Sequence, residues 1–488
     1  MHDATTDRSL DPTDWAAFRA QAHRVLDDTL TYLETLADRP VWQPPTPEAL
    51  ASYQAPLPET PGGFGAAYAE FLQHIVPHTI GNPHPRFWGW VQGGGTPQLV
   101  LAELLATALN TNSAIGNHVG LYLELQVLGW LKALLGWPET ASGLLTSGAS
   151  MANVVALTVA RNSLPGTDVR AEGLAPLGSK LRVYCSAETH NCVHKALDLI
   201  GLGRVALRSV PVDADYRINL AALEGAIAED RAAGLLPFAL VGNAGTVNTG
   251  ATDPLDALAD IAAREHLWYH IDGAFGALAW LVPEQQAALR GLQRADSLSF
   301  DLHKWPAIPY EAGCVLVKDA DKHRAAFASP TSYLAHHPRG LSAGPDPLAN
   351  FGPELSRGFR ALKVWFGLKV HGPAEYRRII AQNIAQAQYL AAQVAATPEL
   401  ELLAPAPLNI VCYRYRPEGL GEAALNSLNK DLLMALHEQG LAAPTYTLLQ
   451  GRYAIRVAHT NHRSTRADFD ALVADTLRLG RALRVAYA

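Results

Sequence analysis

The sequence predicts an α/β protein in which a large domain with a mainly parallel sheet lies between an N-terminal helical arm and a smaller C-terminal α+β domain. Two observations carry this prediction. From about residue 97 to 375, apolar runs of strand length alternate with stretches of helical periodicity, which is typical of a parallel sheet covered on both faces. The chain also has 488 residues, 49% of them hydrophobic and 17% charged, enough for a large core shared among two or three domains.

Residues 1–96 are predicted to form the arm and its connector. Residues 14–38 have the periodicity of an amphipathic helix, and the proline-rich segment 40–45 ends that helix. This part of the chain is too short to fold alone.

The large domain is predicted to span residues 97–375. Its clearest strands are Leu181–Ser186, Phe238–Asn243, Leu267–Asp272 and Gly313–Lys318. Helical periodicity marks Leu121–Leu135 and Asp253–His266. One more apolar stripe predicts a helix that ends near Gly372, and it consists of Leu355, Phe359, Leu362 and Phe366.

Residues 376–488 are predicted to form the smaller α+β domain. Strands are expected at Leu408–Tyr415 and Arg452–Ala458. Thr465, with Asp468 three residues later, predicts a helix start, because such a pair can bond reciprocally to the first turn of a helix.

Composition excludes several classes of protein. The formal net charge is −7 and no basic cluster is present, which argues against a nucleic-acid partner. The first residues are polar and no apolar stretch reaches membrane-spanning length, so we expect no membrane association and a cytoplasmic location. The four cysteines have no CxxC spacing, so we expect neither a disulfide framework nor a zinc site, and no other metal site is expected.

Lys304 is the most informative residue. It follows His303 at the end of an apolar run and precedes a second apolar strand. A lysine is rarely buried without a partner, and desolvation weakens its preference for the charged form, so that its amine becomes nucleophilic near neutral pH. This is what a Schiff-base lysine requires, although a structural lysine is the alternative.

Polar residues follow the other strands as well. Residues 146–153 place small side chains and hydroxyls at a turn that opens an apolar helix, which predicts either an anion site or an ordinary serine-capped helix start. Asp272 ends a strand, where it can either hold a cationic ring nitrogen or cap the next turn. His190 and Thr246 also follow strands, and the alternatives for them are a structural histidine and a polar turn.

The carboxyl ends of successive parallel strands meet at one crevice, so these side chains are predicted to converge. An anion cradle, an imidazole, a carboxylate for a ring nitrogen and a nucleophilic lysine are together what pyridoxal 5'-phosphate requires. The chain at this point resembles the group II pyridoxal-phosphate decarboxylases of fold type I, which include aromatic-L-amino-acid, glutamate, cysteine-sulfinate and diaminobutyrate decarboxylases. The motifs that carry the resemblance are residues 146–153, 186–190, 245–246, 270–274 and 299–304.

The resemblance implies a seven-stranded sheet, a homodimer with the active site at the subunit interface, and a role for each matched residue. Lys304 would bind the cofactor covalently, Asp272 would pair with the ring nitrogen and His190 would stack on the ring. The phosphate would be held by Ser147, Gly148, Ala149 and Ser150, with His303 beside it. Thr246 and Ala274 would lie near the cofactor ring.

The resemblance also implies a catalytic tyrosine, Tyr333, on a mobile loop. It would reprotonate the product after carbon dioxide leaves, although a tyrosine that merely packs a loop is the alternative. Phenylalanine at this position is associated with relatives that form aldehydes, so Tyr333 favours simple decarboxylation.

The substrate is predicted to be an L-amino acid, preferably aromatic. Phe87, Trp88 and Trp90 could line an apolar pocket or belong to the core, and His118 could line the entrance. Arg456 could bind the substrate carboxylate or lie at the surface. Arg86, within a His-Pro-Arg-Phe segment, instead resembles members that act on acidic substrates.

Other functions stay open on the sequence alone. An acidic amino acid or diaminobutyrate is the alternative substrate. An aldehyde synthase, another pyridoxal-phosphate lyase or an aminotransferase would share the cofactor residues. A binding protein without catalysis on the same scaffold is the alternative from another class, against which the presence of Lys304, Asp272 and His190 argues.

Overall fold

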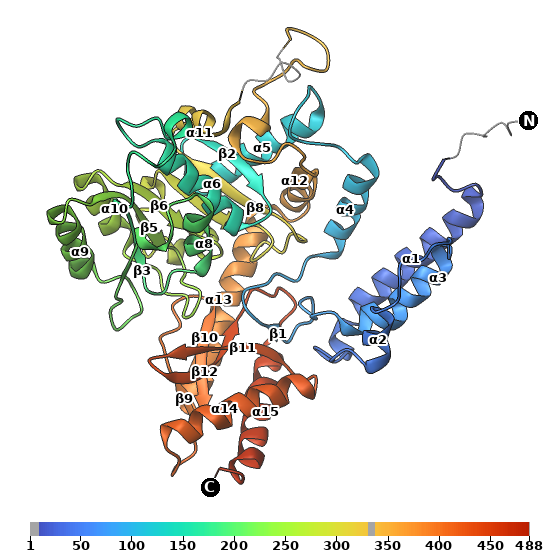
Figure 1. Cartoon of the computed structure of the whole chain (residues 1–488). Helices are drawn as coiled ribbons and strands as arrows, with labels where there is room; N and C mark the ends of the chain where they lie inside the picture. Colours follow the sequence, from blue (N-terminus) through green and yellow to red (C-terminus); the bar gives the residue numbers. More distant parts are fainter. Residues whose placement is uncertain (1–8, 330–336, 488) are drawn as a thin grey trace, which may run out of the picture.

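The computed structural model describes residues 9–329 and 337–487. Its centre is a seven-stranded sheet in the order β2-β8-β7-β6-β5-β3-β4 (Figure 1). The strands are β2 (Ser142–Thr146), β3 (Leu181–Ser186), β4 (Leu207–Val210), β5 (Leu236–Asn243), β6 (Trp268–Asp272), β7 (Ser297–Asp301) and β8 (Gly313–Val317). The five strands from β4 to β7 run parallel, whereas β8 is antiparallel to both β7 and β2. The predicted mainly parallel, seven-stranded sheet is therefore confirmed, and the four predicted strands are β3, β5, β6 and β8.

Helices cover both faces of this sheet, which explains why its strands read as unbroken apolar runs. Val183 and Cys185 of β3 pack in one cluster with residues of α6 (Ala149–Asn162) and α8 (Asn191–Leu199). Tyr184, between them, points to the other face and packs with α9 (Leu220–Ala232) and α10 (Leu255–Arg264). The remaining helices around the sheet are α4 (Pro97–Leu109), α5 (Val119–Leu134), α7 (Val169–Glu172), α11 (Ala320–Phe327) and α12 (Arg360–Val370).

The parallel strands bring polar residues to one edge of the sheet. Asn243 at the end of β5 pairs with Asp272 at the end of β6, and Asp272 pairs with Ser299 of β7. Side chains that are about 30 residues apart in sequence thus become neighbours. This edge is where ligands bind in open α/β sheets.

A second sheet, in the order β1-β11-β12-β10-β9, forms the core of the C-terminal region. Its strands are β1 (Phe87–Trp88), β9 (Leu400–Leu402), β10 (Ile410–Tyr415), β11 (Ala443–Leu449) and β12 (Arg452–Ala458), and α13 (Gly372–Ala396), α14 (Glu422–Glu438) and α15 (Arg466–Arg484) accompany them. The predicted capping box of Thr465 and Asp468 opens α15. Strand β1 comes from the N-terminal part of the chain and pairs in parallel with β11.

Two details of the predicted organisation differ from the structure. Helix α12 begins at Arg360, so Leu355 lies before the helix and its place in the apolar stripe was coincidental. The boundary expected at residue 375 falls inside α13, a 25-residue helix that runs from one sheet to the other (Figure 1). The division into three domains stays a prediction.

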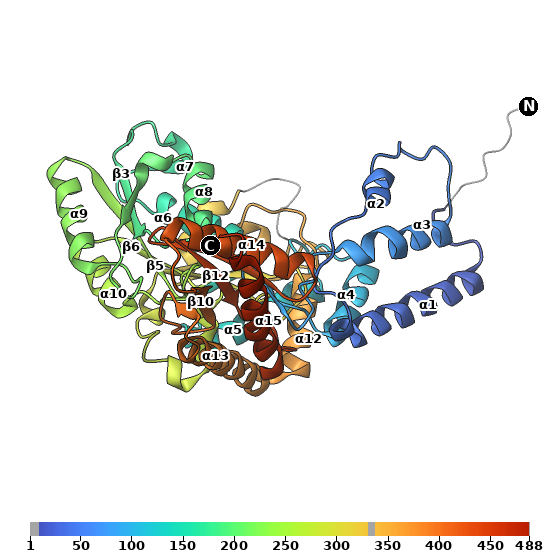
Figure 2. The same cartoon turned by 90° about the horizontal axis from the view of Figure 1, so that it is seen from below.

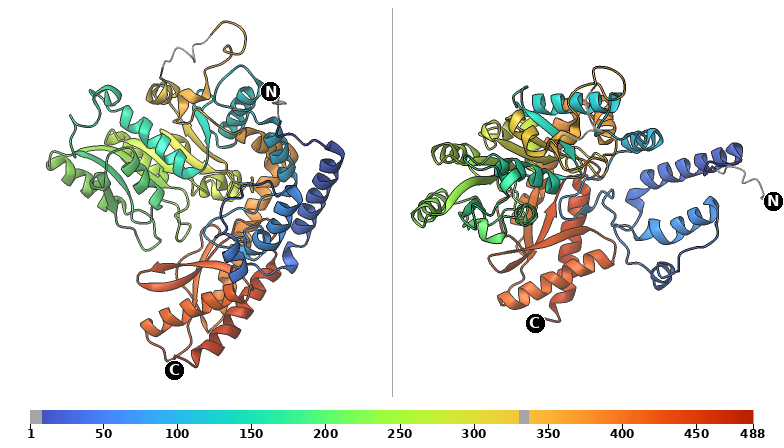
Figure 3. Two further views of the ribbon diagram at one scale, coloured as in Figure 1. Left: turned by 45° about the vertical axis from the view of Figure 1, so that its right-hand side comes forward. Right: turned by 45° about the horizontal axis from the view of Figure 1, so that its top comes forward.

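The N-terminal helices α1 (Trp15–Glu34), α2 (Pro47–Ser52) and α3 (Phe64–Glu70) extend away from the rest of the molecule. The view from below and the right-hand oblique view show the same separation (Figures 2 and 3). Every residue of α1 and α3 is exposed or half-buried. Within the described chain, no helix is both long and apolar enough to span a membrane.

Candidate active site

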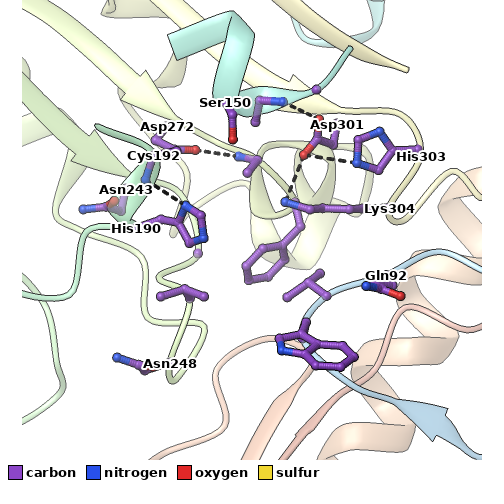
Figure 4. A pocket seen from close by; sticks show the side chains of 18 of the residues that line it. Gln92, Ser150, His190, Cys192, Asn243, Asn248, Asp272, Asp301, His303 and Lys304 are labelled. Atoms are coloured by element: carbon purple, nitrogen blue, oxygen red, sulfur yellow. Dashed lines mark hydrogen bonds and ion pairs between the residues drawn. The ribbon is translucent and has the colours of Figure 1, made fainter. Parts of the chain in front are cut away.

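A cavity of about 650 Å³ lies at the carboxyl ends of the large sheet, facing the small sheet. The loops after β2, β3, β5, β6 and β7 form one wall, while Arg456 of β12 with Thr445 and Tyr446 of β11 approach from the other. Figure 4 shows that Asp272, His190 and Lys304 point into the same space, Asp272 from the end of β6 and the other two from the loops after β3 and β7. The predicted convergence of the strand ends is therefore what the fold produces.

The turn between β2 and α6 has the features of an anion site. Helix α6 begins at Ala149, and residues 147–150 line the cavity, so the first N–H groups of this helix lie at its wall. The turn is held tightly from behind, because a Cβ atom on Gly313 of β8 would lie 2.5 Å from the Gly148 Cα. The Thr146 hydroxyl donates a hydrogen bond to the Gly148 carbonyl over 3.0 Å.

Asp272 is buried and fixed by three donors. Its Oδ2 accepts a hydrogen bond from Asn153 Nδ2 at 3.1 Å and from the Cys192 thiol at 3.5 Å, and its Oδ1 accepts one from the Ala274 N–H at 3.0 Å. Asn153 is oriented in turn, since its Oδ1 lies 2.6 Å from His270 Nε2 and 2.9 Å from the Ser299 hydroxyl. The carboxylate is thus held in one orientation at the cavity wall.

His190 presents a neutral imidazole to the cavity. It stands at the N-terminus of α8, where its Nδ1 accepts a hydrogen bond from the Cys192 N–H at 3.2 Å. Desolvation by the surrounding protein lowers the pKa of His190, and the charge of Lys304 lowers it further although Asp272 acts in the opposite direction. The ring is therefore mostly uncharged at neutral pH, as a ring that stacks on an aromatic cofactor can be.

Lys304 reaches the cavity with a charged partner. Its Nζ lies 2.9 Å from Oδ2 of Asp301, the last residue of β7, and the lysine side chain is only 19% exposed. Asp301, three residues earlier, ends the strand beside it and supplies the partner that a buried lysine requires. The position of the amine at the cavity agrees with the prediction.

Most of the predicted cofactor residues line this one cavity. They are Ser147, Gly148, Ala149, Ser150, His190, Asp272, Ala274, His303 and Lys304. Thr246 is different, because it is buried and its hydroxyl lies 3.2 Å from the Thr249 hydroxyl, turned away from the cavity between its lining neighbours Gly245 and Val247. Tyr333 lies outside the described residues.

Three of the predicted substrate-side residues, Phe87, Trp88 and His118, do not line the cavity. Trp88 belongs to the core of the small sheet, where its ring stacks on Phe469 at 4.8 Å, and Phe87 is buried beside Ala443. Neither of these two side chains lines the cavity. Strand β1 ends at Trp88, and Trp90, whose backbone is left-handed with a φ of 53°, lines the cavity instead. His118 caps α5 and bonds the Ile115 carbonyl.

Arginine 456 was predicted either to bind the substrate carboxylate or to lie at the surface. The surface alternative is wrong, because the side chain is 3% exposed and lines the cavity. Burial lowers the pKa of Arg456 to about 10, so it stays charged at neutral pH. Arg86, which suggested an acidic substrate in the sequence, forms an ion pair at 3.6 Å with Asp468 in the first turn of α15.

Sequence reasoning missed several cavity residues. They include Gln92, Asn248, Phe275, Asp301, Tyr310 and Tyr446. Asp301 had a usable signal, since it ends a strand exactly as Asp272 does, two residues before His303. Tyr446 had none, because it reaches the cavity from the partly polar strand β11 of the other sheet.

These groups fit pyridoxal phosphate. A helix N-terminus suits its phosphate, a buried carboxylate suits its ring nitrogen, a neutral imidazole suits its ring and a lysine amine suits its aldehyde. The crowding of Gly313 against Gly148 leaves a cradle of backbone rather than of side chains at the turn. The fold and the site together define a pyridoxal-phosphate enzyme.

Comparison with known proteins identifies the family. Residues 48–416 match the family model of the pyridoxal-dependent decarboxylase conserved domain. The chain is 33% identical to an aromatic-L-amino-acid decarboxylase of Bacillus atrophaeus over 96% of each protein, and 28% identical to a phenylacetaldehyde synthase of Arabidopsis thaliana over 92% of this chain and 93% of that protein. The solved structure of Oryza sativa TDC with PLP and tryptamine superposes with a TM-score of 0.90 at 25% identity, covering 97% of this chain and all of the other.

The chain belongs to the pyridoxal-dependent decarboxylase family. The fold-type I architecture, the pyridoxal 5'-phosphate cofactor and the activity of a carboxy-lyase acting on an amino acid, all predicted from the sequence, are confirmed. What each residue contributes to that activity is a matter of proposal.

Proposed function

We propose that this protein decarboxylates an aromatic L-amino acid to the corresponding amine. The observation that carries the proposal is the aromatic lining of the cavity. Four aromatic side chains line it, namely Trp90 and Tyr446 from segments of the small sheet and Phe275 and Tyr310 from loops of the large sheet. An aromatic substrate would find extensive apolar contact with such a wall. The names of the relatives, which include tryptophan and tyrosine decarboxylases, support the same choice.

We assign the cofactor contacts from the geometry of the chain itself. Lys304 holds the cofactor covalently, the N–H groups of residues 147–150 hold its phosphate, and His190 packs on its ring. Asp272, fixed by Asn153, Cys192 and Ala274, keeps a proton on the ring nitrogen, because a carboxylate favours the charged form of a nearby base. When bound, pyridoxal phosphate supplies the electron-accepting ring on which decarboxylation depends.

Arg456 has little capacity left for a substrate carboxylate. Its guanidinium donates to the carbonyls of Trp90, Val247 and Asn248 and to the Thr445 hydroxyl. A guanidinium has five N–H groups, so within the described residues one N–H remains to reach a ligand. We infer that Arg456 mainly fixes the loop of Trp90 and the loop after β5 around the cavity, and contributes a single hydrogen bond to the substrate.

The experiment that tests the proposed function is a panel of the twenty amino acids with L-DOPA, 5-hydroxytryptophan and diaminobutyrate, scored for carbon dioxide release. We expect the aromatic members to be turned over with the highest kcat/KM, since only they can use the aromatic wall. Faster release from glutamate, aspartate or diaminobutyrate would contradict the aromatic assignment while leaving the decarboxylase activity in place.

An aldehyde synthase is the second candidate, favoured by the 28% identity to phenylacetaldehyde synthase. The two reactions are distinguished by their products, because aldehyde formation also yields ammonia and hydrogen peroxide. We propose Tyr333 as the proton donor that favours the amine, on the strength of the family resemblance. Equimolar amine and carbon dioxide, without peroxide, is the expected result.

We propose that the protein is a homodimer. Helix α4 exposes Leu101, Leu104, Leu105 and Leu109, and the arm exposes further large apolar side chains, among them Trp15, Phe18, Phe64 and Phe71. An exposed apolar surface of this extent indicates a protein interface, and an isologous twofold contact is the commonest arrangement. Light scattering coupled to size exclusion should give twice the chain mass of 52.4 kDa, whereas a mass of one chain would refute the dimer. A cytoplasmic location stays a prediction.

A further inference from the structure

A carboxylate stands at the site to which the cofactor phosphate is assigned. Asp301 is 3% exposed, and its Oδ1 accepts a hydrogen bond from the Ala149 N–H at 2.6 Å, at the first residue of α6. Its Oδ2 lies 2.9 Å from Lys304 Nζ and 3.6 Å from His303 Nε2. Figure 4 shows Asp301 between Ser150, His303 and Lys304. One acidic side chain thus contacts both the anion-binding turn and the lysine.

The turn is packed closely against this carboxylate. A Cβ atom on Gly148 would lie 3.2 Å from the His303 ring and 3.5 Å from Asp301 Oδ1, which shows how closely the turn approaches them. On its other side, Gly148 is packed against the backbone of Gly313. Asp301 is itself the end of a strand whose five residues are all buried. The anion-binding turn and the Asp301 carboxylate are therefore held close together.

The positive charge near Asp301 is limited. Burial lowers the pKa of His303, and its Nδ1 accepts a hydrogen bond from the Ala312 N–H, so at neutral pH the ring is mostly neutral with its proton on Nε2. Lys363, which faces His303 from α12, is paired with Glu103. The ring of Tyr310 lies against that of His303, with centroids 4.3 Å apart and planes tilted by 34°, and Tyr310 is neutral, since burial raises its pKa. Lys304 is the charged partner of Asp301 among the described residues, and the same amine is the proposed attachment point of the cofactor.

A phosphate monoester brings a charge of about −1.5 to −2 at neutral pH. At this turn it would share the α6 N-terminus with Asp301, and covalent attachment would take the Lys304 amine from its carboxylate partner. Like charges held close together in a partly buried site repel strongly. Resting on the proposed function of this site, we propose that Asp301 is a positioning residue that weakens retention of the cofactor phosphate, so that this enzyme holds its cofactor exchangeably.

The test is Asp301→Asn, measured as the affinity and dissociation rate of pyridoxal phosphate from its absorbance, without reference to turnover. The amide oxygen can still accept the Ala149 N–H, so the change removes charge with little change in shape. We expect the Kd for pyridoxal phosphate to fall roughly tenfold or more, and its dissociation to slow, because one like-charge pair is removed. Asp296→Asn is the matched control, since Asp296 precedes the opposite end of β7 and accepts the Tyr269 N–H.

Binding of pyridoxal, which lacks the phosphate, distinguishes the contact of Asp301 with the anion-binding turn from its contact with Lys304. Repulsion of the phosphate predicts a much larger gain for pyridoxal phosphate than for pyridoxal in Asp301→Asn. An equal gain for both compounds, or an unchanged or weaker affinity for pyridoxal phosphate, would overturn the proposal. Asp301→Ser provides a second neutral variant if the asparagine protein folds poorly.

Binding of inorganic phosphate tests the role of Asp301 without relying on the proposed function. Titration calorimetry of the cofactor-free protein should show tighter phosphate binding to Asp301→Asn than to the wild type and to Asp296→Asn. If neither protein binds pyridoxal phosphate, the assignment of the cofactor contacts fails, whereas the phosphate titration still decides the role of Asp301. Equal phosphate affinity in all three proteins would refute it.

Discussion

Lys304→Ala protein is expected to lose the visible absorbance of covalently bound cofactor and to turn over substrate on the order of a thousandfold or more slowly. The physical reason lies in its position. Lys304 is the lysine that lines the cavity, with its amine next to the turn of residues 147–150. Without this amine, the aldehyde of the cofactor has no nucleophile to hold it, and both the orientation and the retention of the cofactor are lost.

The measurement combines an absorbance spectrum after removal of free cofactor with the rate of carbon dioxide release. Lys318→Ala is the matched control, because Lys318 follows β8 and bonds the Arg294 carbonyl away from the cavity. Circular dichroism should show that both variants are folded. Retention of the absorbance band and of normal turnover by Lys304→Ala would refute the central assignment of this site.

Asp272→Asn is expected to lower kcat by roughly a hundredfold to a thousandfold while the cofactor remains bound. An amide carries no negative charge, so it cannot stabilise a proton on the ring nitrogen, and the cofactor ring loses its power to accept electrons. The loss should appear in kcat rather than in KM, because the substrate itself does not contact this carboxylate. The Asn153 Nδ2 and the Ala274 N–H, which now donate to the carboxylate, would still surround an isosteric side chain.

The test measures kcat and KM together with the position of the cofactor absorbance band. Asp230→Asn removes a buried carboxylate that accepts the Tyr184 hydroxyl in the same domain, and it should affect turnover far less. If Asp272→Asn keeps the wild-type kcat and spectrum, Asp272 does not hold the ring nitrogen. A lost cofactor would instead make it a structural residue of the site.

The success of sequence reasoning at the strand ends has a clear cause. Parallel strands all end at the same edge, so a polar residue that follows an apolar run is placed near the site whatever the loops do. This holds for His190 after β3 and for Lys304 after β7. It fails for the direction of a side chain within a loop, as Thr246 shows, because that direction depends on local hydrogen bonds such as the one to Thr249.

The substrate side was predicted poorly because it is assembled from distant segments. Trp88 and Trp90 are two residues apart, but strand β1 ends at Trp88 and the backbone of Trp90 is left-handed, with a φ of 53°. The first side chain therefore enters the core of the small sheet while the second lines the cavity. Tyr446 and Arg456 reach the same cavity from strands of the second sheet. The sequence pattern of one segment contains no information about which other segments will pack beside it.

The amino-acid sequence by itself determined the α/β class, the cofactor and the reaction class, and it placed most of the predicted cofactor residues at one cavity. It did so because those features depend on local patterns, namely apolar runs and the polar residues that follow them. The tertiary structure alone decided which aromatic rings line the cavity, which groups accept hydrogen bonds from Arg456, and that Lys304 is paired with Asp301. These depend on contacts between elements, in which packing and charge compensation select one arrangement from several that the sequence permits.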